Sequence, residues 1–220
     1  MTAVRAIFWK EIRSFLRDRL RLGALGLFVV VFGVYFAGRY GMVLLVPTAL
    51  LTMVAATYAF SQVSFRREMS EKTMPALLAS PTSLGMVLLG KSFAVFVASY
   101  AIEMVGLAIC VISSWICVGR LPTLTSVYVS TVVVPIWGFV VIELFGVAYS
   151  LVRGGVGAWL LTVPIYLAVL LGAVRPSTSE AIGRALSSSW LLPLTGLVLA
   201  GLLASVLAGL SKDRMTRVSS

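Results

Sequence analysis

The sequence predicts an all-α integral membrane protein with six transmembrane helices, an interfacial amphipathic helix before them and both termini in the cytoplasm. Of the 220 residues, 60% are hydrophobic, and the mean hydropathy is +1.03, whereas soluble domains are about 45–50% apolar. The apolar residues form runs long enough to span a bilayer, and the basic residues gather on one side of these runs. The whole chain, 1–220, is therefore predicted to form a single transmembrane domain.

The segment 3–21 is predicted to be the amphipathic helix. Its apolar residues recur at steps of three and four and form one stripe, which contains Val4, Ile7, Phe8, Ile12, Phe15, Leu16 and Leu20. Its charged residues, Glu11 among them, are assigned to other faces, and Trp9 lies at the edge of the stripe. A basic amphipathic helix of this kind lies in the headgroup layer, so membrane lipid is its expected partner.

Six apolar segments follow, and each is interpreted as a span of the bilayer, which needs about 20 residues. They cover residues 22–38, 42–64, 84–118, 123–150, 155–174 and 190–210. The first is short and the third and fourth are long, so tilt or interfacial extension is expected. Prolines inside spans are tolerated where neighbouring helices satisfy the freed carbonyl groups; these are Pro47, Pro135, Pro164 and Pro193.

Lysine and arginine are divided unequally between the two sides of these spans. Fourteen of the 18 lie in the termini, in the 65–83 loop, at Lys91 or at Arg153, and four lie on the other side, at Arg39, Arg120, Arg175 and Arg184. Cytoplasmic segments carry such an excess. The asymmetry predicts a multi-pass protein of the cell membrane with cytoplasmic termini. It also explains the net charge of +10 without a nucleic-acid partner.

The largest loop on the outer side, 175–189, contains a further helix signal. Ser177 and Glu180 have the spacing of a capping box, and an apolar stripe follows them. The segment is expected to form a short extracytoplasmic helix on the membrane surface, with a solvated polar loop as the alternative.

The longest stretch that is not plainly apolar covers residues 65–92, and its first part, the loop 65–83, lies between the second and third spans. Thr73 suits an N-cap, Pro75 suits the first helical turn, and Leu77 and Leu78 give the short helix an apolar side. Pro81 then ends the helix. A helix this short is marginal in water on its own. It is therefore expected to pack against the membrane surface or, in view of its flanking charges, in a groove on a protein partner.

The residues 85–92, GMVLLGKS, match the phosphate-binding pattern G-x-x-x-x-G-K-[ST] letter for letter. A true phosphate cradle follows a buried strand and exposes its backbone amides. Here the variable positions are apolar and a membrane span follows. Nucleotide binding is therefore rejected, and Lys91 is expected to extend to the cytoplasmic headgroups as the third span begins.

The 65–83 loop resembles the cytoplasmic loop of the type 2 ABC exporter permease family. The resemblance rests on Phe65-x-x-Glu68, on Thr73-Met74-x-x-Leu77-Leu78-x-Ser80-Pro81-Thr82-Ser83 and on Leu89-Gly90-Lys91. Lys72 stands where the family usually has glycine, and Pro75 stands where it usually has glutamate. Within the family, Arg153-Gly154-Gly155 and Leu160-Leu161-x-x-Pro164-Ile165-Tyr166 also resemble the B subunit of the cytochrome c maturation haem exporter.

The resemblance implies a non-catalytic transport subunit without a cofactor or a metal. Its loop would dock into a separate ATP-binding subunit, and two permease copies, or this chain and a homologous permease, would assemble with two ATPases. By the resemblance, the coupling residues are Glu68, Thr73, Met74, Leu77, Leu78, Ser80 and Pro81. The exported substrate is expected to be hydrophobic or amphipathic.

Two acids lie inside predicted spans. Glu103 follows Lys91 by twelve residues and Glu143 precedes Arg153 by ten, which predicts similar depths near the middle of the bilayer at about 1.5 Å per residue. An acid at this depth is costly and must face protein or water. Ser99, Glu103, Gly106 and Cys110 are expected to share one helical face. Three roles stay open: a protonated group hydrogen-bonded between helices, a part of the substrate path, or a proton relay.

Other functional classes are constrained by composition. The chain has no histidine, which excludes a Ser–His catalytic pair and the common histidine metal sites. Cys110 and Cys117 are separated by about 10 Å of helix, too far for a disulfide, and both are expected to be small buried apolar residues. The main alternative to an ABC permease is an ion- or proton-coupled carrier that uses Glu103 and Glu143.

Overall fold

The computed structural model describes residues 3–40, 45–66, 83–119, 121–151 and 191–208. Every element in these ranges is helical, and they contain no strand, so the all-α prediction is confirmed for them. Three helices, Leu45–Ser64, Gly85–Val118 and Leu124–Leu144, are long and apolar enough to cross a membrane, and a shorter apolar helix covers Pro193–Leu207. The predicted span 155–174 and outer helix 175–189 lie outside the described residues, as does most of the 65–83 loop.

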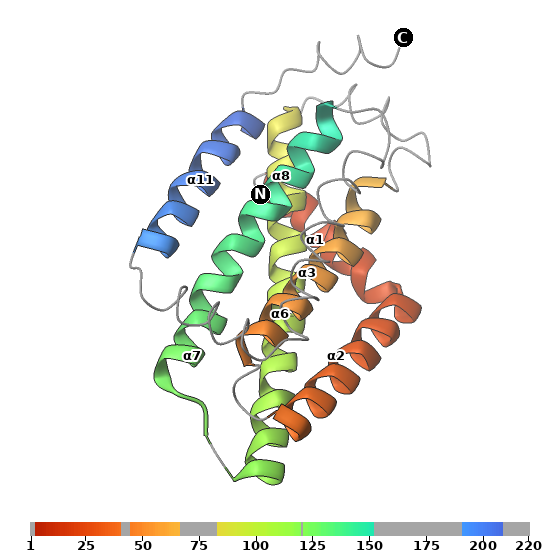
Figure 1. Cartoon of the computed structure of the whole chain (residues 1–220). Coiled ribbons are helices and arrows are strands. Elements are labelled where there is room, and N and C mark those ends of the chain that lie inside the picture. The colour runs from red at the N-terminus through yellow and green to blue at the C-terminus, as the bar shows by residue number, and fades with distance from the viewer. Residues whose placement is uncertain (1–2, 41–44, 67–82, 120, 152–190, 209–220) are drawn as a thin grey trace.

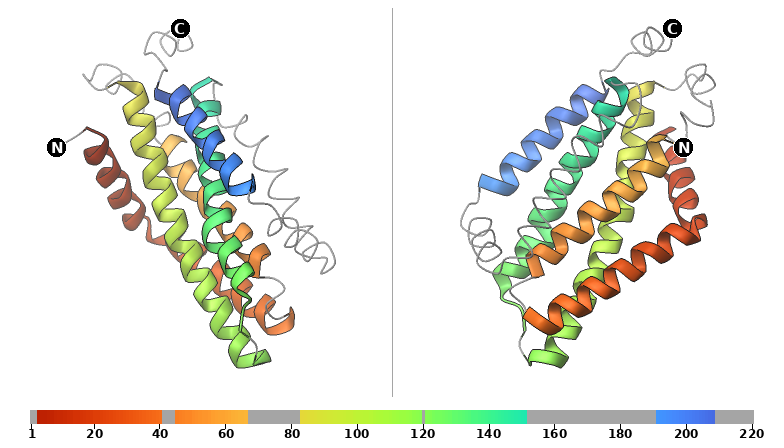
Figure 2. Two further views of the ribbon diagram at one scale, coloured as in Figure 1. Left: turned by 90° about the vertical axis from the view of Figure 1, so that its left-hand side faces the viewer. Right: turned by 45° about the vertical axis from the view of Figure 1, so that its right-hand side comes forward.

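The helix α6 (Leu84–Val118) is the centre of the bundle and contacts α1, α2, α3, α8 and α11. It has 35 residues, or a length of about 52 Å. The Ser83 side chain caps its first turn by accepting a hydrogen bond from the Met86 amide, and Gly119, with a positive φ of 69°, ends it. Figures 1 and 2 show α3 (Leu45–Ser61) and α8 (Val134–Leu151) running in the opposite direction to α6, with α11 (Leu191–Ala208) against α8.

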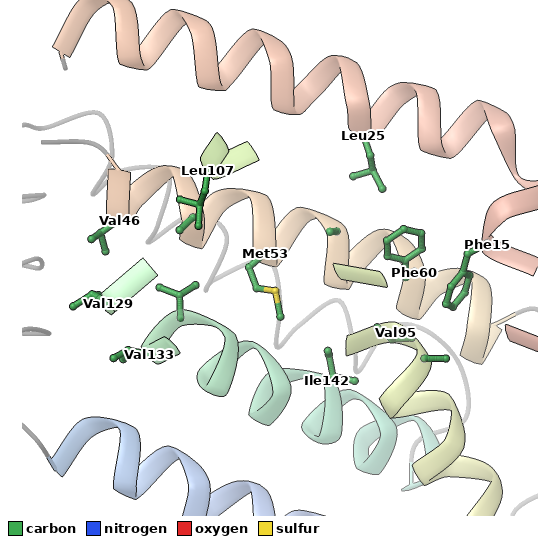
Figure 3. Close-up of a cluster of buried hydrophobic side chains, with 14 of the residues drawn as sticks. Phe15, Leu25, Val46, Met53, Phe60, Val95, Leu107, Val129, Val133 and Ile142 are labelled. Carbon is green, nitrogen blue, oxygen red and sulfur yellow. The ribbon is translucent and has the colours of Figure 1, made fainter. Parts of the chain in front are cut away.

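Buried apolar side chains from α1, α3, α6 and α8 join these helices into one core (Figure 3). The Phe15 and Phe60 rings lie 4.8 Å apart and link α1 to α3. Gly138 of α8 lies so close to Met53 of α3 that any side chain at position 138 would displace the methionine. Small residues at helix contacts are typical of membrane bundles, where close packing replaces the hydrophobic effect.

The predicted amphipathic helix 3–21 is divided in two. α1 covers Ala3–Arg17 and α2 covers Arg19–Tyr40, which contains the predicted first span. Asp18 separates them: its side chain accepts a hydrogen bond from the Arg21 amide at 3.3 Å, and its carbonyl accepts one from the Leu22 amide at 3.1 Å. Asp18 is therefore the N-cap of α2, a position that aspartate favours.

Part of the apolar stripe of α1 packs against protein, so the stripe is not presented to lipid as a whole, and the predicted position of the helix in the headgroup layer stays a prediction. Phe15 is buried against Phe60. A side chain at Gly90 of α6 would meet Ile7 at 3.1 Å. Leu16 and Leu20, which were assigned to the same stripe, are exposed instead. Spacing alone identified an apolar face but could not say whether lipid or another helix covers it.

The predicted fourth span is interrupted by a π-helix. It consists of α7 (Leu124–Tyr128), η3 (Val129–Val133) and α8. Pro135 has no amide hydrogen to donate to the Thr131 carbonyl four residues earlier. The Tyr100 hydroxyl of α6 donates to that carbonyl instead, at 3.5 Å. A neighbouring helix thus supplies the hydrogen bond that the carbonyl group loses at the proline, as the sequence predicted for prolines inside spans.

Candidate functional site

The predicted coupling residues lie outside the described residues, but the two ends of their segment are defined. On one side α3 continues into the π-helix η2 (Gln62–Arg66), and on the other α6 begins at Leu84. Glu68, Thr73, Met74, Leu77, Leu78, Ser80 and Pro81 all fall between these ends. Their roles stay predictions.

A buried lysine holds the two ends together. Lys91 of α6 is only 2% exposed, and its ammonium lies 3.2 Å from Glu11 Oε1 of α1. The same ammonium donates a hydrogen bond to the Ser64 carbonyl of η2. The expectation that Lys91 extends to the headgroups is therefore wrong. We call Lys91, Glu11 and the Ser64 carbonyl the clamp.

Close packing between α1 and α6 brings Glu11 within reach of Lys91. A Cβ atom at Gly90 would lie 3.2 Å from the Val4 carbonyl oxygen and 3.1 Å from an Ile7 side-chain carbon. Because Gly90 has no side chain, the α1 backbone can approach α6 at this point. Glu11, one turn after Ile7, then reaches Lys91.

The residues that match the phosphate-binding pattern, 85–92, are helical. All eight residues belong to α6, whereas a phosphate cradle needs a loop with free amides. The lysine that would contact a phosphate is engaged by Glu11 and Ser64. This geometry supports the rejection of nucleotide binding.

Glu11 was missed as a site residue, although the sequence contains the signal. Its assignment to another face was wrong, because it lies four residues after Ile7 and four before Phe15 and is buried with the stripe that packs against protein. It is also the single acid of α1. A lone acid on a buried stripe predicts a buried cationic partner, because an unpaired buried charge is costly.

The predicted buried face of α6 is confirmed. Ser99, Glu103, Gly106 and Cys110 are all buried. A side chain at Gly106 would meet Thr52 of α3 at 3.1 Å and Val29 of α2 at 3.2 Å. Glu103, one turn before Gly106, therefore lies on the face of α6 that packs against α2 and α3. Cys110 is buried as expected, whereas Cys117 is exposed.

Both membrane acids are fully buried, and within the described ranges neither has a hydrogen-bond partner. Glu103 and Glu143 are 0% exposed, and all four of their carboxyl oxygens are unpaired there. Of the two alternatives, protein or water, both acids face protein, and the hydrogen bond between helices, one of the three roles left open, is not found among the described residues. Within the same ranges, other buried hydroxyls also lack a hydrogen-bond partner, including those of Thr57, Ser61, Ser92, Ser99, Ser114 and Ser130.

The two acids do not lie at similar depths. Phe139 of α8 contacts Phe93 and Phe96 of α6, with ring centroids 5.5 and 5.1 Å apart. Glu103 follows Phe96 by seven residues, while Glu143 follows Phe139 by four on a helix of opposite direction (Figure 1). Counted from Phe96 or from Phe93, the acids are thus separated by about 16–21 Å along the bundle. Glu143 lies toward the clamp and Glu103 deeper.

The Glu103 carboxyl, which has no partner among the described residues, leads to a stability prediction. Replacing an unsatisfied buried polar group by an apolar one of similar shape is neutral or stabilising. We expect Glu103→Leu to raise the free energy of unfolding by about 1–3 kcal/mol, measured by reversible unfolding in mixed detergent–SDS micelles. Glu103→Gln, which keeps polar atoms, should change it less. A loss of stability in Glu103→Leu would show that the carboxyl has a partner.

The described residues contain no group of three or more acidic, cysteine or histidine side chains that could hold a metal. The chemistry available there is therefore that of two isolated buried acids, a run of hydroxyls and one buried ion pair. Comparison of the chain with protein-family models, with curated proteins and with solved structures found no match.

Proposed function

We propose that this chain is the permease subunit of an ATP-driven exporter, which moves a hydrophobic or amphipathic substrate out of the cytoplasm. A separate ATP-binding subunit would supply the energy by docking onto the 65–83 segment. The observation that carries the proposal is the clamp, because it fixes both ends of the segment whose residues resemble the permease coupling loop. A second copy of this chain or a homologous permease would complete the transport path.

The clamp gives a physical route for this coupling. A displacement of the segment after Arg66 would act on η2 and α6 together, because Lys91 bonds to the Ser64 carbonyl. Through Glu11 the same displacement would act on α1. Helices are stiff, so a tilt imposed on the 35 residues of α6 would extend to the far end of the bundle.

The lengths of α2 and α6 are consistent with a clamp that lies outside the hydrocarbon core of the bilayer, on the side proposed to be cytoplasmic. Gly106 of α6 packs against Val29 of α2, and the two helices run in the same general direction (Figure 2). From this contact Arg19 lies about 15 Å away along α2, and Lys91 about 22 Å away along α6. If Arg19 marks the headgroup boundary, Lys91 lies beyond it. The rest of α6 then spans the roughly 30 Å core.

One observation favours a second function, an ion- or proton-coupled carrier. Glu103 is a fully buried acid inside a predicted span, without a hydrogen-bond partner among the described residues, and acids inside membrane spans mark ion pathways and proton relays. In a carrier, transport would follow an ion gradient and would need no second protein. The same acid fits an exporter as part of the substrate path.

The two functions are separated by isolating the tagged chain from its native membrane in mild detergent. The exporter proposal expects an ATP-hydrolysing subunit to co-purify in a fixed ratio. A chain that purifies alone from intact membranes, yet moves an ion in vesicles, would favour the carrier.

Topology is a separate prediction that tests the six-span arrangement. Reporter fusions after Arg39, Arg120 and Arg184 should be active on the outside, and fusions after Lys72, Arg153 and Ser220 on the inside. The reason is the charge asymmetry. An outside signal at residue 72 would contradict the arrangement, because it would place the coupling segment away from any cytoplasmic ATPase.

A further inference from the structure

The outward face of α1 has no partner in the described bundle. Trp9 is 46% exposed and Leu16 is 64% exposed, on the side of the helix opposite Glu11 and Phe15. Arg5, Trp9 and Arg13 follow at steps of four, so they form one line along this face. The face is a mixture of apolar and basic side chains, unlike the apolar stripe that packs against α6.

The charge of this face is uniformly positive. Arg5, Arg13 and Arg17 are exposed, and none of them forms an ion pair with a carboxylate of the described residues. The single acid of α1, Glu11, is turned inward and held by Lys91. Asp18, just after α1, pairs with Arg21 at 3.2 Å. The clamp therefore leaves a helix face with three arginines and no acid.

We infer that this face, Arg5, Trp9, Arg13, Leu16 and Arg17, docks onto anionic phospholipid headgroups. Tryptophan favours the membrane interface, and basic residues near an anionic leaflet each add attraction. The position fits if Arg19, the first residue of α2, marks the headgroup boundary, since Arg17 lies just before it. The inference rests on the proposed function only for placing α1 on the cytoplasmic side, where anionic lipids are concentrated.

The experiment follows Trp9 fluorescence in the full chain reconstituted into vesicles. The chain has five tryptophans, so the Trp9 signal is the difference between the wild type and Trp9→Phe. The vesicles contain phosphatidylcholine with equal fractions of phosphatidylglycerol, and one of the two lipids carries bromine as a quencher. We expect brominated phosphatidylglycerol to quench Trp9 several-fold more than brominated phosphatidylcholine, with a preference that falls as salt increases.

A matched variant pair tests whether the arginines of α1 cause the preference. Replacing Arg5, Arg13 and Arg17 by glutamine should abolish it. Replacing Lys212, Arg214 and Arg217 by glutamine removes the same charge from the C-terminal tail and should leave it intact. Equal loss in both variants would overturn the inference, since net charge would then explain the result.

Two results in the wild type would also overturn the inference. Equal quenching by the two brominated lipids would mean that the face binds membrane without selecting charge. No quenching by either would mean that something other than lipid covers the face. Because the vesicles contain this chain alone, the outcome is independent of whether an ATP-binding partner exists.

Discussion

Replacing Lys91 by methionine should destabilise the bundle by about 3–5 kcal/mol, the cost of removing one partner of a buried ion pair. The variant leaves the Glu11 carboxylate, only 7% exposed, without its ammonium. It also leaves the Ser64 carbonyl without its hydrogen-bond donor. The measurement is reversible unfolding of the purified chain in mixed detergent–SDS micelles.

A second ion pair in the same chain provides a matched control. Arg21 and Asp18 are also 3.2 Å apart, but their side chains are 47% and 33% exposed. Arg21→Met should cost about 1 kcal/mol or less, as exposed pairs do. Similar costs for Lys91→Met and Arg21→Met would show that water reaches the clamp.

The double variant Glu11→Gln with Lys91→Met separates the ion pair from packing. Because no unpaired charge remains, it should recover more than half of the stability lost in Lys91→Met. A double variant that is as unstable as the single one would assign the loss to the Lys91 side chain's packing instead.

The helices were predictable because their signals are local. Runs of apolar residues marked the segments that α2, α3, α6, α8 and α11 occupy, and the spacing of Ser99, Glu103, Gly106 and Cys110 identified the buried face of α6. The helix break at Asp18 was missed, because both sides of it are helical and only the cap interaction distinguishes them.

The clamp could not be predicted from the spacing of residues within a single helix. Glu11 and Lys91 are separated by 80 positions, and nothing near either residue specifies the other. The predicted depth of Glu143 was wrong for a related reason. Counting forward from Lys91 and backward from Arg153 assumed that these two residues lie at the same level, whereas the contacts of Phe139 with α6 fix a different register. Register between helices is a tertiary property.

The second large effect is expected from Leu77→Asp combined with Leu78→Asp. In the proposed exporter these leucines insert into a groove on the ATP-binding subunit, and a few such residues carry most of the binding energy. Two carboxylates there should abolish co-purification of the subunit and uncouple ATP hydrolysis from transport. The chain should remain at normal abundance, because no contact inside the bundle is proposed for them.

Leu121→Asp with Leu124→Asp is the matched control. Both leucines are exposed at the far end of α6 and the start of α7, so the substitution adds the same charge on the predicted outer side. It should leave co-purification unchanged. If both double variants lose the partner equally, a general effect on the chain is responsible.

The most direct measurement places a photoreactive amino acid at position 77 and illuminates native membranes. Contact between the 65–83 segment and an ATP-binding subunit is the central claim, and crosslinking reports contact without requiring a known substrate. The exporter account predicts a crosslinked product that contains this chain and an ATP-binding subunit, and no such product from the same probe at position 124. A probe at position 77 that crosslinks only to lipid or to this chain itself would contradict the account.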